Sequence, residues 1–232
     1  MIHPSMAARV SRLLVPALLT VMAPVLAGAQ SAPGALAWPP MGTEVVIERE
    51  ASGSYGPAGA AFGGPAGRIA WKFERREWKG RSVVAAVSAE DKTVLFEVES
   101  AATVAELDNT GRPVWTYEPP LLSIQWPLAV GKSWTAEARM TEESFGSKPV
   151  VPVRLEVRVE AVETVTVPAG TFEAFRVVST TRRGWTSRHW VVPSLGLQSY
   201  FAVKGIEERP SSNLLGAGRR EWRLVALTLP AR

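Results

Sequence analysis

Apolar and polar residues alternate along most of this chain, which is the pattern of β-strands that bury one face. The clearest run covers residues 153–161, where five apolar residues alternate with two arginines and two glutamates. The same alternation occurs in residues 68–77, 92–99 and 133–140. A shift of one residue would move the charged row of 153–161 into the core, so we expect the register of this strand to be fixed.

The most specific local signal is a β-hairpin in Val165–Val178, whose sequence is VTVPAGTFEAFRVV. The first strand is predicted to end at Val167 and to be followed by a tight turn at Pro168–Gly170. Proline presets φ at the first central turn position, and glycine accepts the positive φ that other residues resist. We expect an antiparallel sheet to extend outward from this hairpin.

The C-terminal part of the chain is predicted to form a second hairpin and a closing strand. The second hairpin pairs residues 184–192 with residues 198–203 around a turn at Pro193–Gly196. Residues 205–218 are predicted to be a long loop, and residues 219–229 the last strand, with apolar residues on both faces.

Two segments interrupt the strand pattern. Residues 51–67 hold six glycines and two prolines, which predicts a long hairpin loop, with a flap over a cavity as the alternative. Residues 113–127 hold four prolines, so we expect them to wrap the edge of the sheet rather than to form a central strand. The sequence therefore predicts a mainly β fold with few or no helices: a curved antiparallel sheet, as a half-barrel or a β-sandwich-like arrangement.

The first 29 residues differ in composition from the rest of the chain. Arg9 and Arg12 precede an apolar run, and Ala27–Ala29 is a small-x-small cleavage site. This is the organisation of a secretory signal peptide, so we assign residues 1–29 to the signal and residues 30–232 to a single β domain. The apolar run contains Pro16 and is shorter than the roughly 20 residues of a membrane span. We therefore expect no transmembrane anchor after cleavage.

Charge and cysteine content narrow the expected partners. The chain has 26 basic and 22 acidic residues, mixed along the strands without a long basic run, which argues against nucleic-acid binding. It has no cysteine, so a disulfide framework and a lipidated cysteine anchor are both excluded. We expect a periplasmic or secreted protein.

The residues for catalysis or metal binding are sparse. His189 is the one histidine beyond the signal peptide, and we expect it at the surface or at a sheet edge rather than as a general base. Two glutamate pairs, Glu97 with Glu99 and Glu156 with Glu160, are predicted on outward strand faces, where ion pairing is the more frequent use. The sequence therefore predicts no enzyme, no cofactor and no metal site.

Nine tryptophans are the one compositional excess that ligand binding could use. Tryptophan buries a large apolar area and can line a lipid pocket or stack on a sugar. The candidate ligand-binding residues are aromatic positions on or beside predicted strands: Trp71, Phe73, Trp78, Trp134 and Trp190. Trp78 lies beside the turn at Gly80 and is the best candidate for an exposed aromatic ring.

Three short motifs carry a resemblance to a known group of proteins. They are Gly131–Trp134 (GKSW), Val167–Phe172 (VPAGTF) and Trp190–Leu197 (WVVPSLGL), all within residues 125–204. Their combination resembles uncharacterised exported bacterial β-proteins of domain-of-unknown-function families. Some of these resemble the half-barrels of the lipoprotein-localisation carriers. The resemblance implies a curved antiparallel sheet and supplies no catalytic residues.

These observations predict a non-catalytic β domain that binds an apolar ligand, such as a lipid, or an envelope protein partner on the concave face of its sheet. The alternative is a cell-wall carbohydrate-binding module that uses exposed tryptophans.

Overall fold

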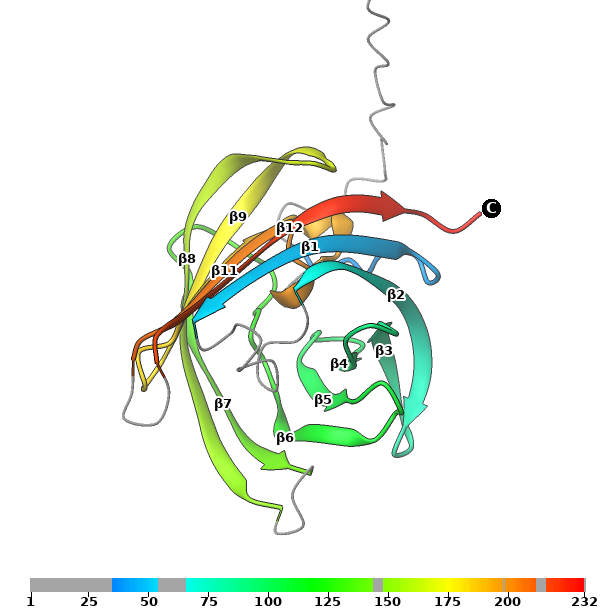
Figure 1. Ribbon diagram of the computed structural model, residues 1–232, viewed down its shortest axis with the longest axis vertical. Helices are drawn as coiled ribbons and strands as arrows, with labels where there is room; N and C mark the ends of the chain where they lie inside the picture. Colours follow the sequence, from blue (N-terminus) through cyan, green and yellow to red (C-terminus); the bar gives the residue numbers. More distant parts are fainter. Residues whose placement is uncertain (1–34, 54–65, 144–147, 198, 212–215, 232) are drawn as a thin grey trace, which may run out of the picture.

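The protein is an antiparallel β-barrel in a computed structural model, which describes residues 35–53, 66–143, 148–197, 199–211 and 216–231. Twelve strands of the described residues close the wall in the order β1-β12-β11-β10-β9-β8-β7-β6-β5-β4-β3-β2, with β2 returning to β1. Figure 1 shows β7 to β12 as one wall and β2 to β6 as the other. The strands are β1 (Glu44–Gly53), β2 (Gly67–Trp78), β3 (Arg81–Val87), β4 (Thr93–Glu97), β5 (Thr103–Leu107), β6 (Pro113–Leu121), β7 (Ser133–Glu142), β8 (Val150–Val167), β9 (Gly170–Thr181), β10 (Thr186–Val191), β11 (Lys204–Arg209) and β12 (Gly218–Thr228).

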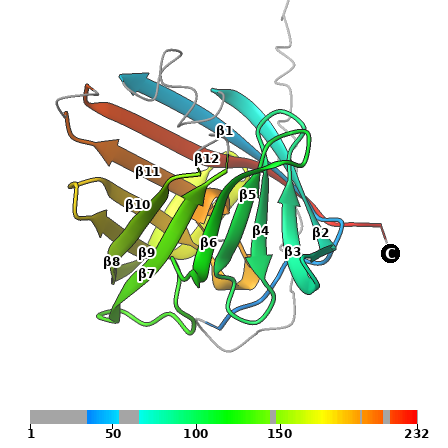
Figure 2. The ribbon, with the colours of Figure 1, turned by 90° about the horizontal axis from the view of Figure 1, so that it is seen from below.

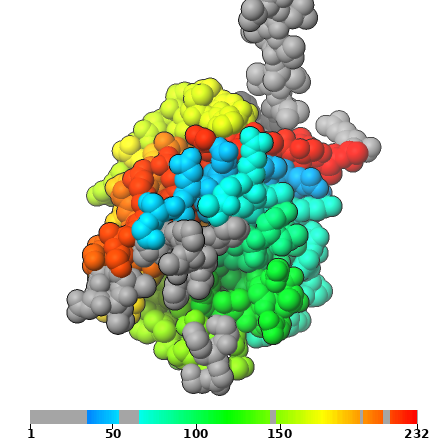
Figure 3. Space-filling view, in the orientation of Figure 1, coloured from blue at the N-terminus to red at the C-terminus, as the bar shows by residue number. Residues whose placement is uncertain are grey.

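The first and last strands close the barrel. β1 pairs with β12 from Glu44 opposite Thr228 to Gly53 opposite Gly218. In the space-filling view the two strands, blue and red, lie against each other on the surface (Figure 3). The predicted mainly β, antiparallel and curved sheet is confirmed, and it closes on itself.

The predicted hairpin is also confirmed, because β8 ends at Val167 and β9 begins at Gly170. Gly170 has a φ of +141°, as the turn required. The hairpin is longer than the neighbouring strands, and the backbone N–H of Ala169 at its tip donates to the carbonyl of Leu224 in β12, at 3.2 Å. The tip thus packs its apolar side chains, Phe172 among them, against the largest core cluster.

The connection between β10 and β11 fills one end of the barrel. It contains two short 3₁₀ helices, η2 (Pro193–Leu195) and η3 (Ser199–Phe201). The ring of Phe201 is 1% exposed and lies 4.9 Å from Trp71, 5.3 Å from Phe73 and 6.0 Å from Phe96, centroid to centroid. We call the described residues of 193–203 the plug, because their apolar side chains pack into the core clusters inside the barrel.

Strands β2 to β6 curl on the right of Figure 1 and stand side by side in Figure 2. Residues of β3, β4 and β5 form a second, smaller core there. Alternate residues of β3 serve the two cores: Val84 and Ala86 belong to the main core, whereas Val83 and Ala85 belong to the second. This accounts for the almost complete burial of β3, β4 and β5 on both faces.

Two predictions about the strands are wrong. Residues 113–121 form β6, which lies between β5 and β7 instead of wrapping an edge. The prolines are tolerated because Pro113 is the first residue of the strand and Pro119 lies beyond its last pair with β7, Glu118 opposite Arg139. The register with β5 also shifts in this stretch, which removes the need for proline N–H groups in the ladder.

Residues 199–203 of the predicted strand at 198–203 belong to the plug, and the residues predicted as a loop after it supply β11. The sequence favoured a tight turn at Pro193, but the chain enters the barrel there before it pairs again. Residues 54–65, which hold most of the predicted flap, lie outside the described residues.

Candidate functional site

A cavity lies against β6, β7 and β8, beside the turn that joins β9 to β10. Its volume is about 950 Å³, and most of its lining is apolar. Its lining residues are Tyr117, Glu118, Pro119, Leu121, Glu137, Ala138, Arg139, Met140, Val151, Pro152, Val153, Arg154, Thr181, Arg182, Arg183 and Trp185. Exposed residues such as Pro152 and Arg183 are among them, so the cavity opens to solvent.

The apolar wall of the cavity follows from the alternation of β7 and β8. Met140 lies opposite Val151, and Ala138 lies opposite Val153, in the paired register of the two strands. Tyr117 of β6 lies opposite Met140 on the other side. Paired residues of neighbouring strands point to the same face, so these five side chains form one continuous surface.

The β9–β10 turn places two arginines and one tryptophan at the mouth. The N–H of Gly184 donates to the carbonyl of Thr181 at 2.9 Å, and the N–H of Trp185 donates to the Thr181 hydroxyl at 3.2 Å. Gly184 has a φ of +74°, which closes the turn. Arg182 and Arg183 are consequently exposed, and Trp185 is half-buried against the cavity.

A buried arginine supports the tryptophan of the mouth. The guanidinium carbon of Arg209 lies 4.1 Å from the ring centroid of Trp185, and Arg209 is 4% exposed. A guanidinium at this distance attracts the face of an indole, so Arg209 holds the ring in place.

A chain of hydrogen bonds continues from the cavity into the barrel. The hydroxyl of Tyr117 donates to Oε1 of Glu106 at 3.1 Å, and Nζ of Lys92 lies 2.5 Å from Oε2 of the same carboxylate. Glu106 is 1% exposed. Burial raises the pKa of Tyr117 well above its ordinary value, and the charge of Glu106 adds to the effect. The phenol therefore stays protonated and acts as a hydrogen-bond donor.

Two further ion pairs also lie inside the barrel. Arg49 of β1 bonds Asp91 at 2.8 Å, with side chains 3% and 5% exposed. Arg220 of β12 pairs with Glu207 of β11. Burying a charge costs free energy, which only a close partner of opposite charge offsets, and each carboxylate here has a cationic partner. These ion pairs therefore form a structural network, and their carboxylates are not free to act as nucleophiles.

The prediction that His189 lies at the surface or at a sheet edge is wrong. His189 of β10 is 8% exposed and faces the interior, where its ring centroid lies 5.4 Å from that of Trp222. Burial lowers its pKa to about 4, against the pull of Glu207, with Arg220 lowering it further. The imidazole is therefore neutral at neutral pH. The alternation of side chains along β10 turns His189 toward the interior of the barrel.

The five aromatic residues predicted to bind a ligand lie elsewhere. Trp71 and Phe73 pack around Phe201 in the main core, and Trp78 is half-buried against the second core. The indole N–H of Trp190 donates to Glu163 at 2.6 Å. Trp134 donates to the carbonyl of Leu122 at 3.1 Å and borders a smaller, more polar cavity of about 530 Å³. Their role in ligand binding stays a prediction, and none of them lines the larger cavity.

The residues of the larger cavity were not singled out from the sequence. The alternation of residues 133–140 and 153–161 did show which side chains face inward, but it did not show that β7 lies between β6 and β8. The Thr-Arg-Arg-Gly-Trp stretch was the one local signal, because a turn there would expose both arginines.

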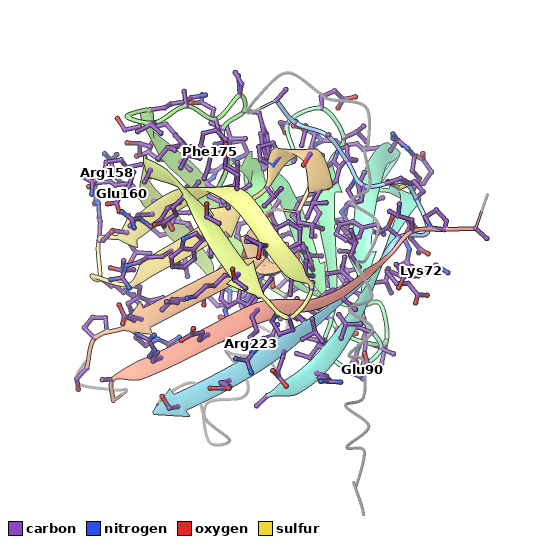
Figure 4. The ribbon with its side chains drawn as sticks, turned by 90° about the horizontal axis from the view of Figure 1, so that it is seen from above. Lys72, Glu90, Arg158, Glu160, Phe175 and Arg223 are labelled. Atoms are coloured by element: carbon purple, nitrogen blue, oxygen red, sulfur yellow. The ribbon has the colours of Figure 1, made fainter. Side chains whose placement is uncertain are left out.

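The outer face of β7 to β12 carries cross-strand ion pairs. Arg176 lies 3.2 Å from both Glu160 and Glu163, and Arg158 also pairs with Glu160. Figure 4 shows Arg158 and Glu160 together on the outer surface of β8, with Arg223 on the outer face of β12. The interpretation of Glu160 as an ion-pairing residue is thus confirmed.

Neither a metal-binding cluster of histidine and acidic residues nor a helix that could span a membrane occurs in the part of the chain that the structure describes.

No family model and no curated protein matches the chain. Among solved structures, it is similar to the hypothetical lipoprotein YmcC of Escherichia coli, with 12% identity and a TM-score of 0.41 over 82% of this chain and 85% of that one. A candidate exported protein with a YmcC-like fold from Bacteroides fragilis aligns at 12% identity and a TM-score of 0.44, over 84% and 99%. A candidate lipoprotein from Parabacteroides distasonis aligns at 13% and 0.36, over 84% and 99%. All three TM-scores are low, so no function is inferred from them.

Proposed function

We propose that this protein is an exported, non-catalytic β-barrel that binds an apolar ligand chain in the cavity bounded by β6, β7 and β8. The observation that carries the proposal is the continuous apolar wall of Met140, Val151, Ala138 and Val153 in a cavity of about 950 Å³. Ligand pockets usually measure roughly 300–1,000 Å³ and combine an apolar lining with a few polar groups.

The structural role of the charged interior supports a non-catalytic function. The buried carboxylates of Asp91, Glu106 and Glu207 each pair with a cation, and His189 is neutral. An acid or base for catalysis needs access to a substrate, whereas these groups stabilise one another.

Export is proposed from residues 1–29, whose composition is that of a signal peptide and which lie outside the described residues. The carbohydrate-binding alternative has less support, because each of the nine tryptophans is buried or half-buried. The tryptophans do not form the flat row of exposed rings that suits a glycan chain.

The test is binding of a neutral, saturated long-chain alcohol to the delipidated mature protein, measured by calorimetry. We expect the wild type to bind the alcohol and Val153→Asn to bind it at least about tenfold more weakly. A carboxamide buried without a partner costs roughly 1–3 kcal/mol, and about 1.4 kcal/mol corresponds to tenfold in affinity.

Val150→Asn is the matched control, because Val150 lies on the same strand but is 58% exposed on the outer side and does not line the cavity. Circular dichroism verifies that both variants are folded. If the wild type binds no apolar chain, or if both variants bind equally well, the proposal is wrong.

A further inference from the structure

The mouth of the cavity has an excess of positive charge. Four arginines and two glutamates line the cavity: Arg139, Arg154, Arg182, Arg183, Glu118 and Glu137. Glu137 pairs with Arg154, and Glu118 lies opposite Arg139 in the register of β6 and β7. These four residues alternate with the apolar wall along their strands, so Arg182 and Arg183 account for the excess at the mouth. The excess is local, because elsewhere on the outer face arginines and glutamates alternate in ion pairs.

Arg182 and Arg183 differ from most arginines of this protein in having no carboxylate partner among the described residues. They are adjacent in the β9–β10 turn, both exposed, and both line the cavity. The bonds of Thr181 with Gly184 and Trp185 fix the turn, so the backbone of Arg182 and Arg183 is held at the mouth and both side chains can reach it. Guanidinium groups bind carboxylate and phosphate oxygens by paired, charge-assisted hydrogen bonds.

An apolar wall and a cationic mouth are complementary to a molecule with an apolar chain and an anionic head. We propose that the ligand is a single-chain anionic amphiphile, whose chain lies against Met140, Val151 and Val153 and whose carboxylate or phosphate head binds Arg182 and Arg183. This inference rests on the proposed function, because it assigns a chemical class to the ligand of the same cavity. Trp185, held by Arg209, lies between the two regions and contacts the first part of the chain.

The experiment compares three ligands of equal chain length on the delipidated mature protein by calorimetry: a saturated fatty acid, its monoalkyl phosphate and its alcohol. Hydrogen bonds to charged groups are worth roughly 1.5–3 kcal/mol. We therefore expect at least one anionic ligand to bind about tenfold or more tightly than the alcohol. If the fatty acid binds more tightly than the monoalkyl phosphate, the preferred head group is a carboxylate; if the phosphate binds more tightly, it is a phosphate.

The double variant Arg182→Gln/Arg183→Gln removes both cations without touching the apolar wall. We expect its affinity for the anionic ligands to fall to that of the alcohol, while its affinity for the alcohol stays within about twofold of wild type. Added salt should weaken anion binding by the wild type only, because the screened charges are absent from the variant.

The matched control is Arg75→Gln/Arg81→Gln, which removes the same charge from exposed positions of β2 and β3 outside the cavity. It should bind all three ligands as the wild type does. If the anionic ligands and the alcohol bind the wild type equally, the assignment of an anionic head is wrong, while the proposed binding of an apolar chain in the cavity is retained. If the control and the cavity variant lose anion affinity equally, the effect is one of net charge and the assignment to Arg182 and Arg183 is overturned. If none of the ligands binds, the proposed function itself fails.

Discussion

His189 shows how far the environment of one residue can depart from its sequence context. A histidine between Arg188 and Trp190 suggests an accessible ring, yet the side chain is buried beside Trp222. The folded state holds its pKa near 4, against 6.5 for an ordinary histidine. Protonation of this ring is therefore coupled to unfolding.

This coupling predicts a pH dependence of stability. Between pH 6.5 and pH 4 the unfolded state binds the proton and the folded state does not, so the free energy of unfolding falls as the pH is lowered through this window. The contribution of His189 to this loss is roughly 3 kcal/mol, at about 1.36 kcal/mol for each unit of pKa. It is measured by urea denaturation of the wild type and of His189→Gln across the window.

We expect the wild type to lose more stability than His189→Gln as the pH falls, because glutamine does not titrate. Ser187→Ala, at the next inward position of β10, should follow the wild type and serves as the control. Parallel curves for the wild type and His189→Gln would contradict the buried, neutral histidine.

At the scale of single residues, the sequence identified which side chains carry charge but not which charges meet. Glu106 belongs to β5, Lys92 to the turn between β3 and β4, and Tyr117 to β6, and nothing in their spacing indicates that they share one hydrogen-bonded cluster. Their proximity depends on the order of the strands. The same is true of Arg49 and Asp91, which are 42 positions apart.

At the scale of elements, the plug is the feature that local pattern did not predict. Residues 193–203 combine a turn-forming Pro-Ser-Leu-Gly with apolar residues, which is equally typical of a hairpin and of a buried connection. A hairpin and a buried connection differ only in whether the fold offers the segment an enclosed apolar space. Closure of the barrel supplies that space, and Phe201 occupies it.

We predict that Phe201→Ala destabilises the protein by about 3–5 kcal/mol, because a large ring removed from a packed core leaves a cavity. Phe175→Ala is the control: Phe175 is only half-buried, beside the cluster of Ile124 and Val191, and its loss should cost less. Chemical denaturation measures both. An equal or smaller loss for Phe201→Ala would mean that the plug is not packed as described. Alcohol binding should survive in both variants, since the plug does not line the cavity.

At the scale of the whole molecule, the decisive contact is the pairing of β1 with β12. These strands are separated by most of the chain, and their register brings Ser52 opposite Arg219. Both side chains are exposed, and the protein has no cysteine of its own. An introduced cysteine pair can therefore report on closure without interference.

We predict that Ser52→Cys/Arg219→Cys forms an intramolecular disulfide under mild oxidation. Directly paired residues on antiparallel strands lie within the roughly 4.4–6.8 Å between Cα atoms that a disulfide spans. The bond should raise stability by about 4 kcal/mol, since it closes a long loop. Thiol titration and thermal unfolding measure the two effects.

Ser52→Cys/Arg188→Cys is the control pair, because β10 is separated from β1 by β11 and β12. It should stay reduced within the monomer. An open sheet would leave the first pair reduced as well, and that result would exclude the closed barrel.

The sequence by itself determined that the chain forms antiparallel strands, which residues face inward in the clearly alternating runs such as 133–140 and 153–161, and where the VPAGTF hairpin turns. These properties depend on side-chain alternation and on the conformations of proline and glycine, which act over a few residues. Only the tertiary structure decided that the sheet closes, that the plug enters it, and that the walls of β7 and β8 meet Arg182 and Arg183 around one cavity. Those outcomes depend on which distant strands pair, and pairing is set by burial summed over the whole sheet rather than by any local pattern.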